Sequence, residues 1–213
     1  MKKIYKVGIV LIVAIALILS AVALWNYNEC ANRLVRLTTY DYITEKIPGA
    51  FDGYKIAVIS DLHNADFADQ IVSILQENNV DIVIFTGDMV QLPDDDLTNT
   101  FAIADQVSGE AEVFAVSGNH EAQNDFFYDI TCQLYDHGIT VLDDTDVYLE
   151  RGSERIKLAG VMDPPAAIDE PNEEDIRHIQ ETIVSFSKYD PGMFSILACH
   201  RATFYPYIKD LPV

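Results

Sequence analysis

The stretch IAVISDLHN, residues 56–64, decides the fold. Its first part, Ile56–Ser60, is a short apolar run of the kind that forms a strand buried on both faces of a sheet. The run ends at Asp61 and His63, which are two positions apart and so point the same way from an extended chain. A buried strand that finishes in a carboxylate and an imidazole predicts a site at its carboxyl end.

The same pattern, a strand followed directly by polar residues, occurs three more times. Asp81–Thr86 is followed by Gly87-Asp88, Val113–Ser117 by Gly118-Asn119-His120-Glu121, and Phe194–Ala198 by Cys199-His200. Segments with apolar residues at helical spacing lie between and around these strands, over residues 65–79, 97–108, 124–137 and 173–188. A short strand at 140–142 and a hairpin over 147–161 complete the pattern. Alternating strands and helices predict an α/β fold with a largely parallel central sheet.

Ligands of open α/β sheets bind at the carboxyl ends of the strands. If the four strands are parallel neighbours, six polar side chains converge on one edge: Asp61, His63, Asp88, Asn119, His120 and His200. Carboxylates, an amide oxygen and imidazoles suit a hard or borderline metal such as Mn, Fe, Zn or Mg. The glycines before Asp88 and Asn119 allow tight turns close to a bound cation.

Other polar residues have less specific readings. His137 precedes a glycine at an expected helix end and His178 lies on a helix face, so both are interpreted as structural. Arg201 follows His200 and could meet a substrate phosphate, but a surface arginine is the preferred reading. Asp163, at the end of another strand, is expected to shape a pocket rather than bind metal.

The composition excludes several functions. The chain has 213 residues, enough for one sizeable domain, and a net charge of -20. Such acidity argues against nucleic acid as a partner, because phosphate backbones recruit Lys and Arg. Acidic runs such as Asp94-Asp95-Asp96 are interpreted as solvated loops. The three cysteines show no Cys-x-x-Cys spacing, so zinc-thiolate chemistry is not indicated.

The N-terminus predicts a membrane segment. Three lysines precede an apolar run, Val7–Trp25, close to the ~20 residues that cross a bilayer as a helix. We therefore expect a cytoplasmic tip and transmembrane helix over 1–25, an approach segment over 26–52 and a domain over 53–213 that lies outside the cytoplasm. In the alternative reading, Ala21-Val22-Ala23 marks the cleavage site of a signal peptide and the protein is secreted.

The ordered set Asp61-x-His63, Gly87-Asp88, Gly118-Asn119-His120-Glu121 and His200 resembles the calcineurin-like metallophosphoesterases over about residues 55–200. The stretch FDGYKIAVISDLHN, residues 51–64, after an apolar segment is similar to the membrane-associated bacterial subgroup of UDP-2,3-diacylglucosamine pyrophosphatase-like enzymes. The resemblance implies a β-sandwich flanked by helices, in αββα layers.

The resemblance also implies the site. Two divalent metal ions, Mn, Fe or Zn, would be held by Asp61 and His63 on one side and by Asn119 and His200 on the other, with Asp88 as the bridge. His120 would not be a ligand but would stabilise charge on the substrate phosphate or protonate the leaving oxygen. The implied function is hydrolysis of a phosphate ester or pyrophosphate, lipid-linked substrates included, by a water that the two metals activate.

One family motif is absent. A Gly-His-x-His sequence, which normally follows the histidine matching His200 and completes both metal shells, occurs nowhere in the 213 residues. We therefore expect the domain to be C-terminally incomplete: a fragment, a truncated gene product or a degenerate member. The alternative function is a catalytically inactive, membrane-tethered binding module.

Overall fold

The structure is a computed structural model that describes residues 2–165, 171–188 and 190–211. The chain divides into two compact units, Met1–Thr38 and Thr39–Val213. The first unit is built on one helix, α1 (Lys2–Asn32). The second unit contains every other helix and strand of the described residues, including all six candidate site residues.

Helix α1 includes the segment that was expected to cross a membrane. Spanning a bilayer requires about 20 consecutive apolar residues in one helix. Among the described residues, no helix meets the combined demands of length and apolarity for a membrane span. The transmembrane helix expected over Val7–Trp25 is therefore not supported by the structure, although the segment is helical.

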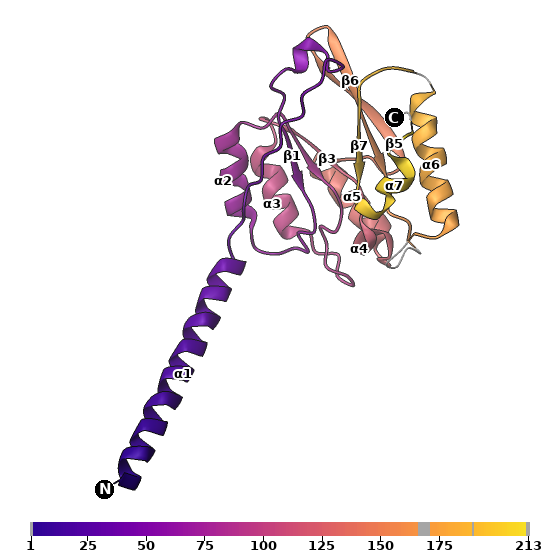
Figure 1. Cartoon of the computed structure of the whole chain (residues 1–213). Helices are drawn as coiled ribbons and strands as arrows, with labels where there is room; N and C mark the ends of the chain where they lie inside the picture. Colours follow the sequence, from indigo (N-terminus) through magenta and orange to yellow (C-terminus); the bar gives the residue numbers. More distant parts are fainter. Residues whose placement is uncertain (1, 166–170, 189, 212–213) are drawn as a thin grey trace. The chain divides into compact units, whose positions relative to one another are not determined.

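The second unit contains two β-sheets (Figure 1). The first has the order β1-β2-β3-β4, and all its strands are parallel. Its strands are β1 (Ile56–Ile59), β2 (Ile82–Phe85), β3 (Glu112–Ala115) and β4 (Thr140–Val141). The second sheet has the order β5-β6-β7, with β5 antiparallel and β7 parallel to β6. Its strands are β5 (Thr145–Arg151), β6 (Glu154–Val161) and β7 (Ser195–Cys199).

Helices cover the outer sides of the two sheets. Helices α2 (Ala68–Asn78) and α3 (Thr98–Val107) pack on each other beside the first sheet (Figure 1). Helix α6 (Glu173–Ser187) packs on the outer face of the second sheet, where Ile179 and Ile183 belong to one buried cluster with Val161 of β6. The remaining elements are η1 (Gly49–Phe51), α4 (Asn119–Ala122), α5 (Phe127–Asp136), η2 (Ala202–Phe204) and α7 (Tyr205–Ile208).

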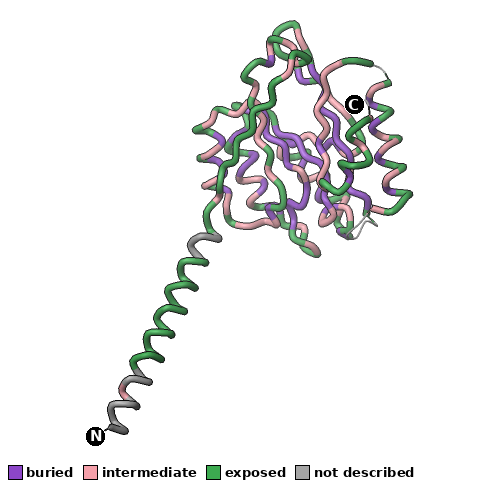
Figure 2. Tube along the Cα trace, viewed as in Figure 1, coloured by how far each residue is buried: buried purple, intermediate pink, exposed green. Residues whose placement is uncertain are grey.

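The main core lies between the two sheets. Ile82 and Ile84 of β2 pack in one cluster with Leu149 of β5 and Leu158 of β6, so the sheets meet face to face. Because side chains alternate along a strand, Val83 and Phe85 point to the other face, and both are fully buried. Figure 2 shows buried residues along the strands and mixed exposure along the helices that flank them. Burying each large side chain contributes about 1.5–3 kcal/mol.

The predicted α/β class and the parallel sheet are confirmed, but one strand lies elsewhere than expected. The strand before His200, β7, is not a neighbour of β1, β2 or β3 and belongs to the second sheet. The condition that all four site strands are parallel neighbours is therefore not met, although the site residues still converge. The compact unit also begins at Thr39, and Phe51 of the predicted approach segment is buried in the inter-sheet core.

Candidate metal centre

The loops after β1 and β2 run side by side at the carboxyl edge of the first sheet. The backbone N–H of Asp61 donates to the carbonyl of Gly87 at 3.0 Å, and that of His63 to the carbonyl of Asp88 at 2.9 Å. Asn64 N–H continues the pairing with the carbonyl of Met89 at 2.8 Å. The two chains thus stay paired past the ends of their strands. This pairing brings Asp61, His63 and Asp88 to one place.

The backbone at these residues is unusual. Asp61, His63 and Asp88 have φ angles of 54°, 48° and 56°, in the left-handed region that residues with a side chain rarely adopt. Aspartate and histidine tolerate this region better than most residues, but each instance still costs energy. Strain of this kind persists only where the surroundings hold it, and it concentrates at functional sites. The strained residues here are candidate ligands.

Two glycines let the loops approach each other closely. A Cβ added at Gly118, between β3 and α4, would lie 2.6 Å from the backbone nitrogen of Asp88. A Cβ added at Gly87 would lie 2.6 Å from the backbone nitrogen of Gly118 and 2.7 Å from Nδ1 of His200. Neither position has room for a side chain. The third loop therefore packs directly on the second.

Asp88 occupies the middle of the site. Its side chain is buried, and its Oδ2 lies 3.6 Å from Nε2 of His200, 3.9 Å from Nε2 of His120 and 4.0 Å from Nε2 of His63. Among the described residues, two groups of side chains have ligand atoms close enough together to hold a metal ion, and both groups include Asp88. The groups are His63, Asp88 and His120, and Asp61, Asp88 and His200.

His200 reaches this site from the second sheet. Its Nδ1 lies 2.8 Å from the carbonyl oxygen of Thr86, which can only accept, so Nδ1 carries the proton. The neutral ring then has its lone pair on Nε2, which faces Oδ1 of Asn119 at 3.3 Å and Oδ2 of Asp88 at 3.6 Å. Nε2 of His200, Oδ1 of Asn119 and Oδ2 of Asp88 are thus three electron-pair donors with no proton between them. This arrangement suits a bound cation. Metal-binding histidines commonly donate their other ring N–H to a backbone carbonyl, as His200 does.

His120 is held by two backbone contacts. The N–H of Leu92 donates to its Nδ1 at 3.0 Å, and its own N–H donates to Oδ1 of Asp88 at 2.9 Å. Because Nδ1 accepts a hydrogen bond, the neutral ring carries its proton on Nε2. That Nε2 faces Asp88, and the ring lies edge-on to His63 with centroids 4.5 Å apart. His120 is thus as close to Asp88 as the other imidazoles, and its predicted role as a non-ligand stays a prediction.

The structure therefore brings together all six residues predicted for the site. The metal-binding roles predicted for five of them stay predictions.

His63 contributes a further observation, because its Nδ1 is buried without a hydrogen-bond partner. A buried polar atom without a partner is costly, and an unmet one often marks a site that binds something else.

Arg201, which is half-buried, pairs with the buried Asp163 near this edge. Arg201 Nη2 lies 3.0 Å from Asp163 Oδ2, with side chains 13% and 1% exposed. The preferred reading of Arg201 as a surface residue is therefore wrong. Burial raises the pKa of Asp163 to about 6, and the Arg201 charge opposes that rise. The two residues follow Val161 and Cys199, which are paired in the parallel register of β6 and β7, and this pairing explains their contact.

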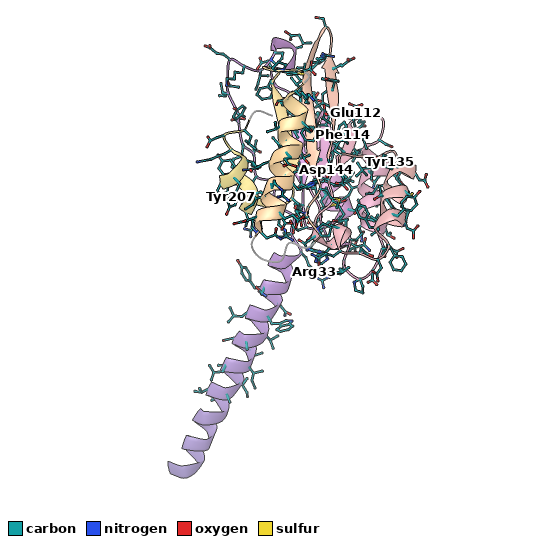
Figure 3. The ribbon with its side chains drawn as sticks, turned by 90° about the vertical axis from the view of Figure 1, so that its right-hand side faces the viewer. Arg33, Glu112, Phe114, Tyr135, Asp144 and Tyr207 are labelled. Atoms are coloured by element: carbon teal, nitrogen blue, oxygen red, sulfur yellow. The ribbon has the colours of Figure 1, made fainter. Side chains whose placement is uncertain are left out.

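The other two histidines are structural, as expected. His137 lies at the C-terminal end of α5, 3.0 Å from Asp105 and stacked on Phe101. His178 on α6 lies 3.0 Å from Asp144, which Figure 3 labels beside that helix. Neither belongs to the two candidate ligand groups found among the described residues.

A separate groove lies between the edges of the two sheets. It has a volume of about 660 Å³ and a mostly apolar lining that includes Tyr42, Val58, Phe194 and Ile196. None of the six candidate site residues lines it. The groove adjoins the metal centre at Thr86, whose carbonyl oxygen contacts His200.

Carboxylates, imidazoles and an amide gather around one aspartate at the carboxyl edge of a parallel sheet. This arrangement defines a metal-binding α/β protein. Residues 54–184, more than half of the chain, match the calcineurin-like phosphoesterase family. The chain therefore belongs to this family, as its motifs predicted.

The proteins similar to this chain include one curated relative and one solved structure. An uncharacterized metallophosphoesterase of Bacillus subtilis (strain 168), YkuE, is 30% identical over 66 residues. The match covers 29% of this chain and only 23% of that relative. The crystal structure of a phosphopantetheinyl hydrolase from Mycobacterium tuberculosis aligns over 73% of both chains, with 14% identity and a TM-score of 0.49.

Proposed function

We propose that this chain is a metal-dependent phosphohydrolase that cleaves a phosphate ester or a pyrophosphate with two bound divalent cations. The observation that carries the proposal is the pair of candidate ligand groups that share the buried Asp88. One carboxylate common to two groups is the arrangement that a pair of cations about 3.5–4 Å apart requires. Family membership supports the same chemistry.

The two groups support a shared Asp88, and the family resemblance assigns the other ligands. Asp61 and His63 would hold the first cation, Asn119 and His200 would hold the second, and Asp88 would contact both. The donor set suits Mn, Fe or Zn. When bound, the cations supply Lewis acidity toward phosphoryl oxygens and lower the pKa of a coordinated water.

The chain's own residues do the remaining work. His120 presents Nε2–H beside Asp88, where it can donate a hydrogen bond to a phosphoryl or leaving oxygen. The strained loops and the glycine contacts hold the ligands in place before substrate arrives, so little reorganisation is needed. Because the chain carries a net charge of -20, bound cations are also needed to attract an anionic substrate.

Hydrolysis of model substrates tests the proposal. The purified chain with added Mn²⁺ should hydrolyse p-nitrophenyl phosphate or its bis-ester, and a chelator should stop the reaction. Asp88→Ala should abolish activity, whereas Asp105→Ala, at the exposed pair with His137, should leave it unchanged. Activity that is indifferent to chelator would contradict the metal-dependent mechanism. Absence of bound metal in the purified chain would favour the alternative, an inactive binding module.

Two finer points belong to the same proposal. Similarity to the UDP-2,3-diacylglucosamine pyrophosphatase-like subgroup suggests testing lipid-linked pyrophosphates after the model esters. Anchoring through residues 7–25, with the domain outside the cytoplasm, is proposed from the sequence alone. Extraction of cell membranes with carbonate at high pH tests the anchor, and release of the protein into the soluble fraction would contradict it.

A further inference from the structure

Glu121 has a role that the sequence did not reveal. It is the last residue of the Gly-Asn-His-Glu motif, and it is only 3% exposed. Its carboxylate accepts four backbone hydrogen bonds: Oε1 from Met89 at 2.7 Å and Val90 at 3.0 Å, and Oε2 from Asp88 at 2.8 Å and Gly118 at 2.9 Å. Backbone amides thus stabilise a buried anion that forms no ion pair among the described residues.

Helix capping accounts for only one of these bonds. A glutamate at the third position of a helix commonly reaches back to the N–H of the capping residue, which here is Gly118. The other three donors lie 31–33 residues away, in the loop after β2. Their successive N–H groups, in a turn that begins with Gly87 and Asp88 at positive φ, form a concave anion site of the kind described for phosphate-binding loops. Here the chain's own carboxylate fills it.

The loop that Glu121 holds carries two parts of the metal centre. Asp88 belongs to both candidate ligand groups, and its backbone N–H is one of the four donors. Leu92, two residues beyond the last donor, fixes the ring of His120 through Nδ1. Asp88 Oδ1 is in turn occupied by the N–H of His120, which leaves Oδ2 facing the imidazoles.

We propose that Glu121 is the positioning residue of the metal centre: its carboxylate fixes the backbone of residues 88–90 so that Asp88 can contact both cations. Glu121 does not itself touch metal or substrate in this scheme. The inference rests on the proposed function, because it assigns a purpose to the geometry of Asp88. It predicts that metal affinity, and not only fold stability, depends on Glu121.

Titration calorimetry of the full chain with Mn²⁺ tests the inference. Glu121→Gln keeps the size of the side chain but has one oxygen instead of two, so two of the four N–H groups would face an NH₂ donor. Changes behind the metal ligands typically cost about 10–100-fold in metal affinity, and we expect a loss in that range. The matched control is Asp175→Asn on α6. Asp175 is also a buried carboxylate at the third position of a helix with a capping box. This control should lose some thermal stability and keep the Mn²⁺ affinity.

The outcomes are distinguishable. Wild-type affinity in Glu121→Gln would overturn the inference while leaving the proposed function intact. A wild-type chain that binds no Mn²⁺ would overturn the proposed function and the inference with it. If Glu121→Gln does not fold, amide hydrogen exchange of the wild-type chain, resolved by NMR, gives the answer. The amides of Met89 and Val90 should exchange as slowly as those of β2, and fast exchange there would overturn the inference.

Discussion

Replacing Gly118 with alanine tests whether the close approach of two loops is required by the site. Gly118 has φ -91°, which alanine adopts without strain, so the substitution is purely steric. The new Cβ would clash with Oδ1 of Asp88 and would lie 2.6 Å from the backbone nitrogen of the same residue, where an ordinary contact begins at 3.4 Å. One of the two loops must therefore move by about 0.8 Å, the difference between these distances.

That displacement would disturb hydrogen-bonded backbone, because the N–H of Asp88 donates to Glu121. Overpacking a tight site typically costs about 1–3 kcal/mol, and we expect that loss in the free energy of unfolding of the metal-free chain. A misplacement of about 1 Å at a reacting centre can cost on the order of 10²-fold in rate. We therefore expect hydrolysis of p-nitrophenyl phosphate to fall by about 10–100-fold in kcat.

Urea denaturation and steady-state kinetics measure the two effects. The matched control is Gly49→Ala, since a Cβ at Gly49 meets nothing within 4 Å and its φ lies outside the left-handed region. That variant should stay within about 0.5 kcal/mol of the wild type and keep its activity. Gly118→Ala with the stability and kcat of Gly49→Ala would refute the argument from close packing.

Three further predictions concern other charged groups. Asp88→Asn removes the one charge common to both ligand groups. Elemental analysis should then find less than two metal equivalents per chain. Two full equivalents would contradict the shared role of Asp88. The pKa of Asp163 is raised from 3.8 to about 6 in the folded chain. Between these values the folded chain keeps a proton that the unfolded chain releases. The stability that this group contributes is therefore lost as the pH rises through about 6. Asp163→Asn should therefore gain stability relative to wild type between about pH 4 and pH 7 in urea titrations, and a shrinking difference would contradict the sign. The buried Lys157 Nζ lies 3.6 Å from Asp146 and 3.8 Å from Asp190. Lys157→Ala should therefore lower the free energy of unfolding, measured with urea, by about 3 kcal/mol. An unchanged free energy of unfolding would show that the two ion pairs contribute nothing.

The sequence predicted the strands and the polar residues at their ends because both depend on local pattern. Apolar runs of four to six residues separated by helical segments are sufficient to identify parallel strands. The expectation that the strand before Asp61 is buried on both faces is wrong, because β1 is an edge strand and its Val58 is 63% exposed. Sheet membership depends on long-range pairing, and no local feature of Phe194–Ala198 distinguishes a strand of the first sheet from a strand of the second. His200 was nevertheless placed correctly at the site, because the two sheets pack face to face with their site-bearing strand ends at the same edge.

Contacts that depend on loop conformation could not be predicted. Nothing near Glu121 in the sequence indicates that its carboxylate accepts bonds from a loop more than 30 residues away. Arg201 was interpreted as a surface residue because its neighbours resemble a strand-to-helix loop. Its partner Asp163 comes from the end of the adjacent strand, and the parallel pairing of β6 with β7 brings them together. The glycines directly before Asp88 and Asn119 were the available signal, since a glycine next to a polar site residue indicates close backbone approach.

The most direct test of the account is electron paramagnetic resonance of the full chain loaded with two equivalents of Mn²⁺. If Asp88 is shared by two cations about 3.5–4 Å apart, the two ions should show exchange coupling, and Asp88→Asn should remove it. A hyperfine sextet from isolated, uncoupled Mn²⁺ in the wild-type chain would contradict a dinuclear centre at this edge of the sheet.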